Sequence, residues 1–205
     1  MQLELKYYDK ICVIGYSGSG KSYLTKHLID NLRLNMIIVD TTSQFSEKKP
    51  IRYKGTVPCL SGRKNIRCLK IQSESDLENI CKNINDKENV PVFLVVDEID
   101  QFTDTYSLMP ETSLFFQQGR NYNHGGLFTI RQVGRLNKQI LSNSHYLFLF
   151  KIFNKNDIAY IEMIIGMPVK DKIQELEPHQ FYIIDLWKSE FVGKFKVVHG
   201  KPEMI

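Results

Sequence analysis

Short apolar runs alternate with amphipathic stretches as far as residue 152, a pattern typical of strands and helices around a mainly parallel sheet. Strands are predicted at 10–15, 36–40, 67–72, 92–96, 127–130 and 145–152. Helices are predicted at 21–33, from Ser73 to about residue 85, at 110–120 and at 135–142. The unbroken apolar run Val92–Val96 is typical of a central strand that is covered on both faces.

The remaining stretches depart from this alternation. Residues 41–65 contain two prolines and two glycines, which predict an irregular insertion with one short hairpin. After residue 152 we expect a helix from Asn154 to Gly166, a short helix after Pro168, and an antiparallel hairpin of strands 181–186 and 190–198. The chain has no internal repeat, low-complexity tract or linker, so residues 1–205 are predicted to form a single α/β domain.

Residues 15–22 read Gly-Tyr-Ser-Gly-Ser-Gly-Lys-Ser, a complete phosphate loop placed between a predicted strand and a predicted helix. Its glycines let backbone N–H groups surround phosphate oxygens, and the helix N-terminus adds unpaired donors. Lys21 is expected to reach the β- and γ-phosphates, and Ser22 to hold Mg²⁺. The residues expected to contact ATP are Gly15, Ser17, Gly18, Ser19, Gly20, Lys21, Ser22 and Tyr23. The alternative is a glycine-rich turn of another α/β protein.

Two carboxylates, Asp97 and Glu98, follow the apolar strand 92–96 directly, as in a Walker B motif. We expect Asp97 to hold Mg²⁺ through water and Glu98 to polarise the water that attacks the γ-phosphate. Gln132 follows the next predicted strand and is expected to sense the nucleotide and orient that water. The alternative is that Asp97 and Glu98 only cap a turn.

Charge is distributed unevenly along a chain of net charge +4. Residues 48–73 contain eight basic residues and no acidic one, while the rest of the chain carries an excess of acidic residues. This basic block suggests a polyanion as partner, although a solvated loop is the alternative. The sequence contains no run of 18 or more apolar residues, so no membrane span is predicted. The N-terminus does not resemble a signal peptide.

The four cysteines have no metal-site spacing. Cys12 is expected to be a buried apolar residue, whereas Cys59 and Cys68 flank a loop and could form a disulfide in an oxidising cell or a hyperthermophile. His124 and His145 show no ligand partners in the sequence and are expected to be structural.

These motifs together resemble the HerA/FtsK superfamily of DNA-translocating ATPases. Asp40 lies where the family places an acidic residue, and Gly119-Arg120-Asn121-Tyr122 resembles its arginine-containing turn before the sensor strand. Residues 135–138, 150–166 and 176–185 resemble its later elements. The chain departs from the family at residues 132–135, where Gln-Val-Gly-Arg replaces the usual Gln-Arg-Pro.

The resemblance implies a P-loop NTPase of the additional-strand, catalytic-glutamate type, with an extra strand between the two Walker strands. It also implies a homo-oligomeric ring, often a hexamer, with nucleotide between subunits and an arginine supplied by the neighbour. Arg120 is the first candidate for that arginine, with Arg131 and Arg135 as alternatives. A bare core of this length is similar to the genome-packaging ATPases of turreted icosahedral archaeal viruses.

We therefore expect one P-loop ATPase domain, with an irregular basic insertion at about 41–66, that uses ATP and Mg²⁺ to move double-stranded DNA, packaging a viral genome. The residues expected to contact DNA are Lys48, Lys49, Arg52, Lys54, Arg63, Lys64 and Arg67. Capsid or portal proteins would be further partners. The protein is expected in the cytoplasm, which for a viral protein is the host's cytoplasm, or in association with the virion. Alternatives are a HerA-like translocase of a plasmid or repair system, a small-molecule P-loop kinase, and a non-hydrolysing nucleotide switch.

Overall fold

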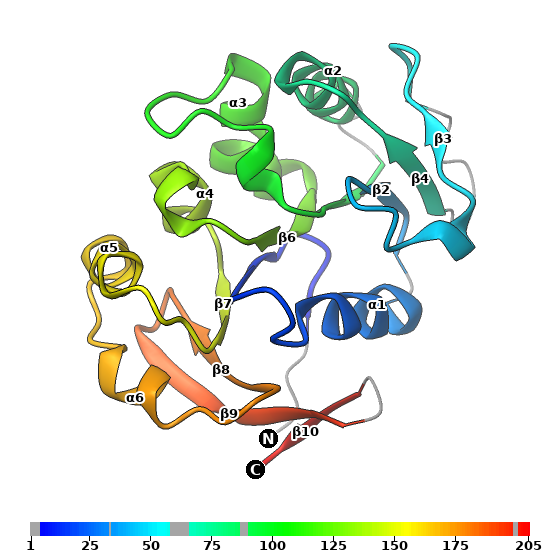
Figure 1. Ribbon diagram of the computed structural model, residues 1–205. Helices are drawn as coiled ribbons and strands as arrows, with labels where there is room; N and C mark the ends of the chain where they lie inside the picture. The colour runs from blue at the N-terminus through cyan, green and yellow to red at the C-terminus, as the bar shows by residue number, and fades with distance from the viewer. Residues whose placement is uncertain (1–4, 33, 58–65, 87–89, 199–200) are drawn as a thin grey trace.

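The protein is described by a computed structural model that covers residues 5–32, 34–57, 66–86, 90–198 and 201–205 (Figure 1). The strands are β1 (Lys10–Ile14), β2 (Met36–Val39), β3 (Ile51–Arg52), β4 (Ile66–Lys70), β5 (Phe93–Val96), β6 (Gly125–Ile130), β7 (Tyr146–Phe150), β8 (Gln180–Asp185), β9 (Glu190–Val198) and β10 (Lys201–Met204). They form one sheet in the order β10-β9-β8-β7-β1-β6-β5-β2-β4-β3.

The helices are α1 (Lys21–Asn31), α2 (Glu74–Asn85), α3 (Pro110–Gln118), α4 (Lys138–Ser142), α5 (Lys155–Ile165) and α6 (Lys170–Gln174). Short 3-10 helices are η1 (Ser46–Lys48), η2 (Ile99–Gln101), η3 (Gly119–Tyr122) and η4 (Val133–Arg135). Side chains cap two helices as predicted: Ser73 accepts from the Asp76 N–H at the start of α2, and Asn154 accepts from the Asn156 N–H at the start of α5.

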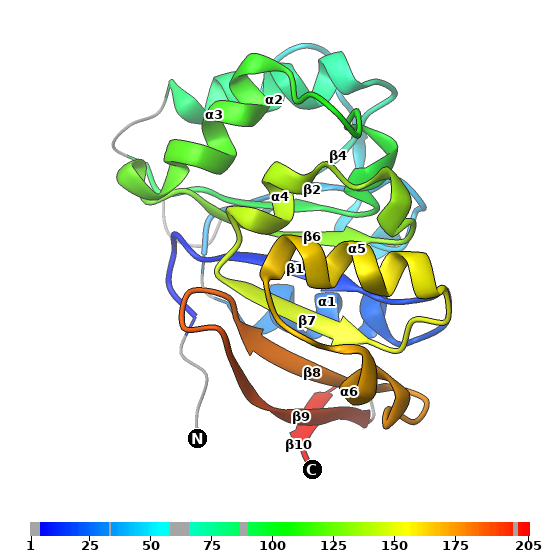
Figure 2. The same ribbon diagram turned by 90° about the vertical axis from the view of Figure 1, so that its left-hand side faces the viewer.

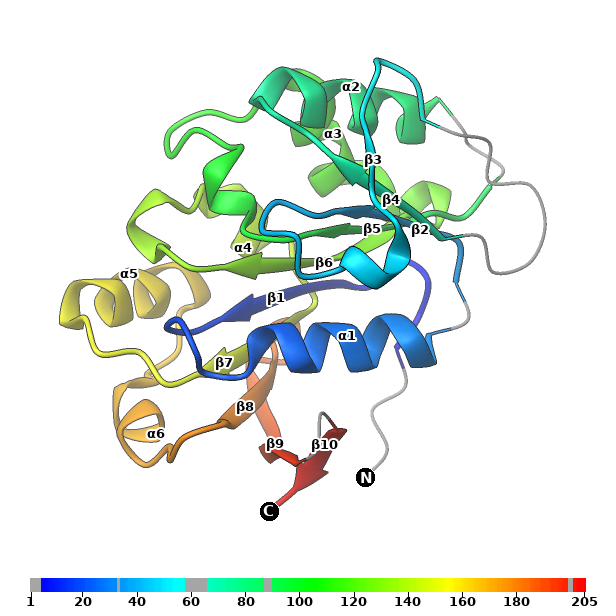
Figure 3. The ribbon, with the colours of Figure 1, turned by 45° about the vertical axis from the view of Figure 1, so that its right-hand side comes forward.

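The sheet is covered on both faces, with α1 on one face and α2 to α5 on the other (Figures 2 and 3). The alternation of side chains along β1 divides the core accordingly. Ile11 and Val13 pack in a cluster with Leu24 of α1, whereas Cys12 and Ile14 pack in the cluster beneath the other helices. Burial on both faces explains why the central strands read as unbroken apolar runs.

The two strands that precede the phosphate loop and the acidic pair are separated by a third strand. β6 pairs in parallel with β1 on one side and with β5 on the other. This arrangement confirms the additional-strand fold expected from the sequence, and the antiparallel pairing of β8 with β9 confirms the C-terminal hairpin. Parallel strands end at the same edge of the sheet, so β1, β5 and β6 all deliver their following residues to one edge, the C-terminal edge.

Several predicted elements differ from those observed. The short hairpin expected within 41–65 is absent from the described part of that segment, where β3 pairs in parallel with β4, and residues 58–65 lie outside the described residues. The helix expected at 135–142 is broken, since η4 ends at Arg135 and Asn137 caps a new helix, α4. Strand β10 was not predicted; it extends the hairpin by pairing antiparallel with β9.

The cysteine prediction is tested at three positions. Cys12, Cys68 and Cys81 are buried free thiols, and burial raises the pKa of each to about 12. Cys59, the partner considered for Cys68, lies outside the described residues. Within the described ranges, no helix is long and apolar enough to cross a membrane.

Candidate functional site

The phosphate loop connects the end of β1 to the start of α1. Gly18 and Gly20 have φ of 83° and 108°, a left-handed backbone that glycine adopts without strain. At Gly15 a Cβ atom would lie 2.5 Å from the Phe150 Cβ, so only glycine lets the loop pass this close to β7. No side chain caps α1 and its first turn holds no acidic residue, so its first N–H groups are left for an anion.

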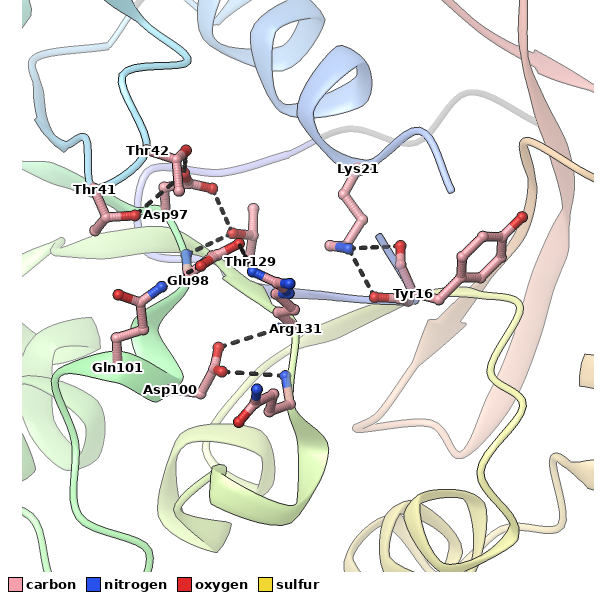
Figure 4. Close-up of polar contacts among 12 residues, drawn as sticks. Tyr16, Lys21, Thr41, Thr42, Asp97, Glu98, Asp100, Gln101, Thr129 and Arg131 are labelled. Atoms are coloured by element: carbon pink, nitrogen blue, oxygen red, sulfur yellow. Dashed lines mark hydrogen bonds and ion pairs between the residues drawn. The ribbon is translucent and has the colours of Figure 1, made fainter. Parts of the chain in front are cut away.

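Lys21 bends back over the loop. Its Nζ donates to the carbonyl oxygens of Gly15 at 2.7 Å and Tyr16 at 3.0 Å (Figure 4). Burial lowers the pKa of this amine, while the charges of Glu98, Asp97 and Asp100 act in the opposite direction. The ammonium group is thus held between the loop and the carboxylates.

Asp97 follows β5 and is 3% exposed. Its Oδ1 accepts a hydrogen bond from the Thr129 hydroxyl at 2.8 Å, and its Oδ2 accepts one from the Thr42 hydroxyl at 2.7 Å (Figure 4). The two hydroxyls come from the ends of β6 and β2, so three strands fix the orientation of this carboxylate.

Glu98 has a left-handed backbone, with φ of 51°, which is uncommon for a residue other than glycine. Its N–H donates to the Thr129 hydroxyl at 2.8 Å, and its carboxylate contacts the Gln101 amide and, at 3.8 Å, the Arg131 guanidinium. Burial raises the pKa of Glu98 and the charge of Asp97 raises it further, whereas Arg131 lowers it. The two neighbouring carboxylates therefore have different partners, Asp97 the Thr42 and Thr129 hydroxyls and Glu98 the side chains of Gln101 and Arg131.

The phosphate loop and the acidic pair meet at one cavity of about 160 Å³ at the C-terminal edge. It is lined by Ser17, Gly18, Gly20, Lys21, Ser22, Tyr23, Gln44, Asp97, Glu98, Thr129, Arg131 and His179. The two motifs lie about 75 residues apart in the sequence, and the insertion of β6 between β1 and β5 brings them to this shared edge.

Two residues expected to bind nucleotide do not line this cavity. Gly15 lies at the base of the loop, and Ser19 is buried, its hydroxyl without a hydrogen-bond partner. Gln132, the expected sensor, lines a neighbouring depression together with Glu98 and Arg135. Its N–H donates to Asp100, as does the N–H of Arg131, and these two bonds tie the end of β6 to η2.

Three residues of the cavity carried no role in the sequence analysis: Gln44, Thr129 and His179. Thr129 is the signal that could have been read, because a hydroxyl residue near the end of an apolar strand between the two Walker strands faces both motifs. His179 comes from the turn before β8, where its φ is 64°, and no local pattern connects that turn to the phosphate loop.

Arg120 lies at the opposite edge of the sheet, the N-terminal edge, in η3 just before β6 begins. There it lines a depression with Tyr8, His145 and Trp187. Arg131, in contrast, lies in the cavity of its own chain, and Arg135 lines the depression beside it. His124 and His145 are buried and accept hydrogen bonds from the N–H groups of Val92 and Lys10, which is a structural role.

Two of the oxygen-bearing side chains that line the cavity are the ones expected to hold Mg²⁺, the Ser22 hydroxyl and the Asp97 carboxylate. In the part of the chain that the structure describes, no group of three or more His, Cys, Asp or Glu side chains could hold a metal ion. Mg²⁺ at phosphate sites is held by one or two protein oxygens, with substrate phosphates and water completing the shell. A hydroxyl and a single oriented carboxylate therefore fit Mg²⁺ bound together with nucleotide.

The basic residues expected to bind DNA are only partly free. Lys48 forms an ion pair with Asp30 at 2.6 Å, and Arg52 donates to the Gln72 side chain at 3.0 Å. Lys49, Lys54 and Arg67 are exposed. Arg63 and Lys64 lie outside the described residues. Tyr53 is 8% exposed and packs in the core, so it is not a base-stacking residue.

Comparison with solved structures shows the same fold in two viral packaging proteins and in a conjugation coupling protein. The genome-packaging NTPase B204 of Sulfolobus turreted icosahedral virus 2, in complex with ATP-γS, superposes with a TM-score of 0.76 at 18% identity, covering 91% of this chain and 96% of that one. The DNA-packaging ATPase B204 of Sulfolobus turreted icosahedral virus gives 0.77 at 20% identity, covering 93% and 98%. The pCW3 conjugation coupling protein TcpA gives 0.64 at 13% identity, covering 95% and 62%.

No curated protein sequence matches the chain. The sequence profile of one family does match, over residues 11–117, which is just over half of the chain and runs from the phosphate loop through the acidic pair to α3. This segment contains both motifs that meet at the cavity. The chain therefore belongs to the AAA family, the ATPases associated with various cellular activities, and is a P-loop ATPase.

Proposed function

We propose that this ATPase is a motor that moves double-stranded DNA and packages a viral genome. The observation that carries the proposal is the cavity at which the phosphate loop and Asp97-Glu98 meet, within a fold that matches viral packaging NTPases over nearly their whole length. The match covers 96% to 98% of each of those two proteins.

The phosphate loop and the acidic pair each have a role in hydrolysis under this proposal. The phosphate loop binds the triphosphate, and Lys21 leaves the carbonyls of Gly15 and Tyr16 to reach its β- and γ-phosphates. Ser22 and Asp97 would hold Mg²⁺, which would supply positive charge to neutralise the phosphates. Glu98 holds the attacking water and accepts its proton, a task that suits a carboxylate whose pKa is raised by burial.

Arg120 completes the site of a neighbouring subunit. It lies at the N-terminal edge, so within one chain the sheet separates it from the nucleotide cavity at the C-terminal edge. A head-to-tail ring brings these two different edges together at every interface. An arginine supplied across that interface stabilises charge that develops on the transferred phosphoryl group. A ring, of six subunits in the expected form, is therefore part of the proposal.

The basic segment contacts DNA phosphates and is connected to the cavity through the turn after β2. Asp40 accepts hydrogen bonds from the N–H groups of Gln44 and Phe45, which shapes this turn, while Thr42 within it binds Asp97. The chain then runs directly into Lys48 and Lys49. A change at Asp97 on hydrolysis is thus transmitted to residues that grip the DNA backbone without reading its sequence.

The test is an ATPase assay with and without duplex DNA, at protein concentrations at which rings assemble. We expect hydrolysis that requires Mg²⁺ and rises several-fold with DNA of any sequence, and that loses this rise as salt increases. The double variant Lys49→Ala, Lys54→Ala should keep the basal rate and lose most of the stimulation. An ATPase rate in assembled rings that does not change when DNA is added would refute the proposal that the protein is a DNA motor.

A plasmid translocase is the second candidate, supported by the likeness to the conjugation coupling protein TcpA. It would use the same cavity and the same DNA stimulation. Co-purification with capsid or portal proteins from infected cells favours packaging, whereas co-purification with conjugation or repair proteins favours this second candidate.

A further inference from the structure

Arg120 is held between aromatic rings at the N-terminal edge. Its Cζ lies 4.2 Å from the centroid of the Trp187 ring and 5.2 Å from that of Tyr8. Both distances fall within about 6 Å, the range of a cation–π interaction. The rings come from distant parts of the chain, since Tyr8 precedes β1 and Trp187 lies in the turn between β8 and β9.

The guanidinium keeps its hydrogen-bonding capacity. Across the described ranges, no carboxylate oxygen lies within 4.0 Å of it, and none of its N–H groups forms a hydrogen bond. The nearby carboxylates are engaged elsewhere, as Asp9 accepts from the Lys6 N–H and Asp185 accepts from the N–H groups of Trp187 and Lys188. An arginine stacked on rings but free of carboxylates retains its planar fork for an external oxyanion.

Trp187 is itself fixed in place. The backbone N–H of Trp187 donates a hydrogen bond to the Asp185 carboxylate at 3.0 Å. Its ring packs against the ring of His145, with the two centroids 4.0 Å apart. His145 is 5% exposed and accepts from the Lys10 N–H at 3.0 Å, which anchors it to β1. The ring on which Arg120 rests is 54% exposed, and these contacts hold it against the N-terminal edge of the sheet. A long side chain that would otherwise sample many rotamers is restrained to few.

We propose that Trp187, together with Tyr8, is the positioning residue that holds Arg120 ready to enter the nucleotide site of a second copy of this chain. The inference depends on the proposed ring, because Arg120 cannot reach the cavity of its own subunit. The partner surface is defined by its chemistry: a triphosphate held on the phosphate loop at the C-terminal edge, which complements a cation with unused donors.

Fluorescence tests the stack in the isolated protein. Trp187 is the only tryptophan of the chain, so all tryptophan emission reports on its surroundings. Arg120→Ala should shift the emission and increase its quenching by a neutral quencher such as acrylamide, because one face of the ring is uncovered. The same substitution at Arg135, an arginine remote from Trp187, is the control and should leave the spectrum unchanged. An unchanged spectrum in Arg120→Ala would refute the stack.

Kinetics in assembled rings tests the positioning role. We expect Arg120→Ala to lower kcat about 10²-fold and Trp187→Ala to lower it about tenfold, both with an unchanged KM for ATP. The double variant should be no slower than Arg120→Ala alone, since Trp187 acts only through Arg120. Trp187→Phe should recover part of the rate, because a phenyl ring still offers a face to the guanidinium.

The outcomes separate the two proposals. Full activity of Arg120→Ala would overturn the role of Arg120 in the neighbouring site, and with it this part of the proposed function. A slow Arg120→Ala with a fully active Trp187→Ala, or with additive losses in the double variant, would overturn the positioning role alone. Tyr106→Ala removes an aromatic ring that is 92% exposed and should behave as wild type.

Discussion

A buried lysine at one end of β1 and a half-buried lysine near the other end lie in opposite settings. Lys21, which follows the C-terminal end of β1 and the phosphate loop, donates hydrogen bonds to loop carbonyls. The negative charges of three carboxylates act to raise its pKa. Lys10, at the N-terminal end, lies over the Phe115 ring, and burial together with the charge of Arg120 lowers its pKa to about 8. One end of the strand thus offers paired charges to a ligand, whereas the other gathers cations around aromatic rings.

The difference follows from strand direction. At the C-terminal edge the chain turns from β1 into the N-terminus of α1. The first backbone N–H groups of that helix are therefore available to bind an anion. At the N-terminal edge the strands begin, and His124 and His145 accept hydrogen bonds from backbone N–H groups. Burial lowers the pKa of both histidines to about 4, so they stay neutral at pH 7. Under the proposed function, the first edge carries out the chemistry within the chain, and the second presents Arg120 to a neighbouring subunit.

The largest effect should come from Lys21→Ala. Removing the amine eliminates the charge that reaches the β- and γ-phosphates, so we expect hydrolysis to fall to background and ATP affinity to fall at least about 10²-fold. ATP titration by calorimetry and an ATPase assay measure both. Lys10→Met, at the other end of the strand, is the matched control and should bind ATP normally. Equal losses in the two variants would contradict the contrast between the edges.

Glu98→Gln should remove turnover while leaving binding intact. An amide cannot accept the proton of the attacking water, so kcat should fall about 10³-fold with ATP affinity within a factor of about three. In the wild-type protein, the raised pKa of Glu98 should place the acid limb of the rate profile above pH 4.5, the ordinary value for this carboxyl group. Glu47→Gln, an exposed carboxylate paired with Lys26, is the control. Retained turnover in Glu98→Gln would reassign the water-activating role.

Thr129→Val should have a smaller effect on the same edge. It removes the hydroxyl that donates to Asp97 and accepts from the Glu98 N–H, leaving two buried groups unpaired. We expect about a tenfold loss of kcat and a higher Mg²⁺ requirement, in line with about 1–3 kcal/mol for such a loss. Thr129→Ser keeps the hydroxyl and should restore the wild-type values. Equal activity of the two variants would show that the hydroxyl does not orient the carboxylates.

Lys10→Met should affect stability alone, and the size of its effect should change with pH. The folded-state pKa of Lys10 lies near 8, below the ordinary 10.5, so the unfolded chain binds more protons between these values. Stability of the wild type should therefore rise with pH across that window, by at most about 3 kcal/mol, relative to the variant. Urea unfolding at pH 7 and pH 10 measures the difference. A pH-independent difference between the two proteins would refute the shifted pKa.

The nucleotide site was largely predictable because its specific parts are local. The phosphate loop occupies eight consecutive residues, and Asp97-Glu98 follow one apolar strand, so each motif can be read without knowledge of the fold. Thr129 and His179 were missed for the opposite reason: each reaches the cavity from another segment, and their types are common at strand ends and turns. Arg131 was considered only as an arginine for a neighbouring subunit, whereas it lines the cavity of its own chain. Gln132 was expected to face the nucleotide, but it lines the neighbouring depression. Arg131, one position earlier in the chain, lines the cavity.

Arg120 shows the limit most clearly. Its place before the sensor strand was visible in the sequence through family resemblance, but nothing local indicated that it lies at the other edge of the sheet or rests on Trp187, 67 positions later in the chain. Likewise, the basic segment was visible as composition, yet only the structure shows which lysines are already paired.

The sequence alone determined the alternation of elements, the phosphate-binding chemistry and the acidic pair, because backbone propensity, apolar periodicity and motif spacing act over a few residues. Tertiary structure decided which strand ends meet, which hydroxyls orient Asp97, and which arginine faces away from its own nucleotide. These are matters of strand order and direction, and pairing between segments far apart along the chain sets both.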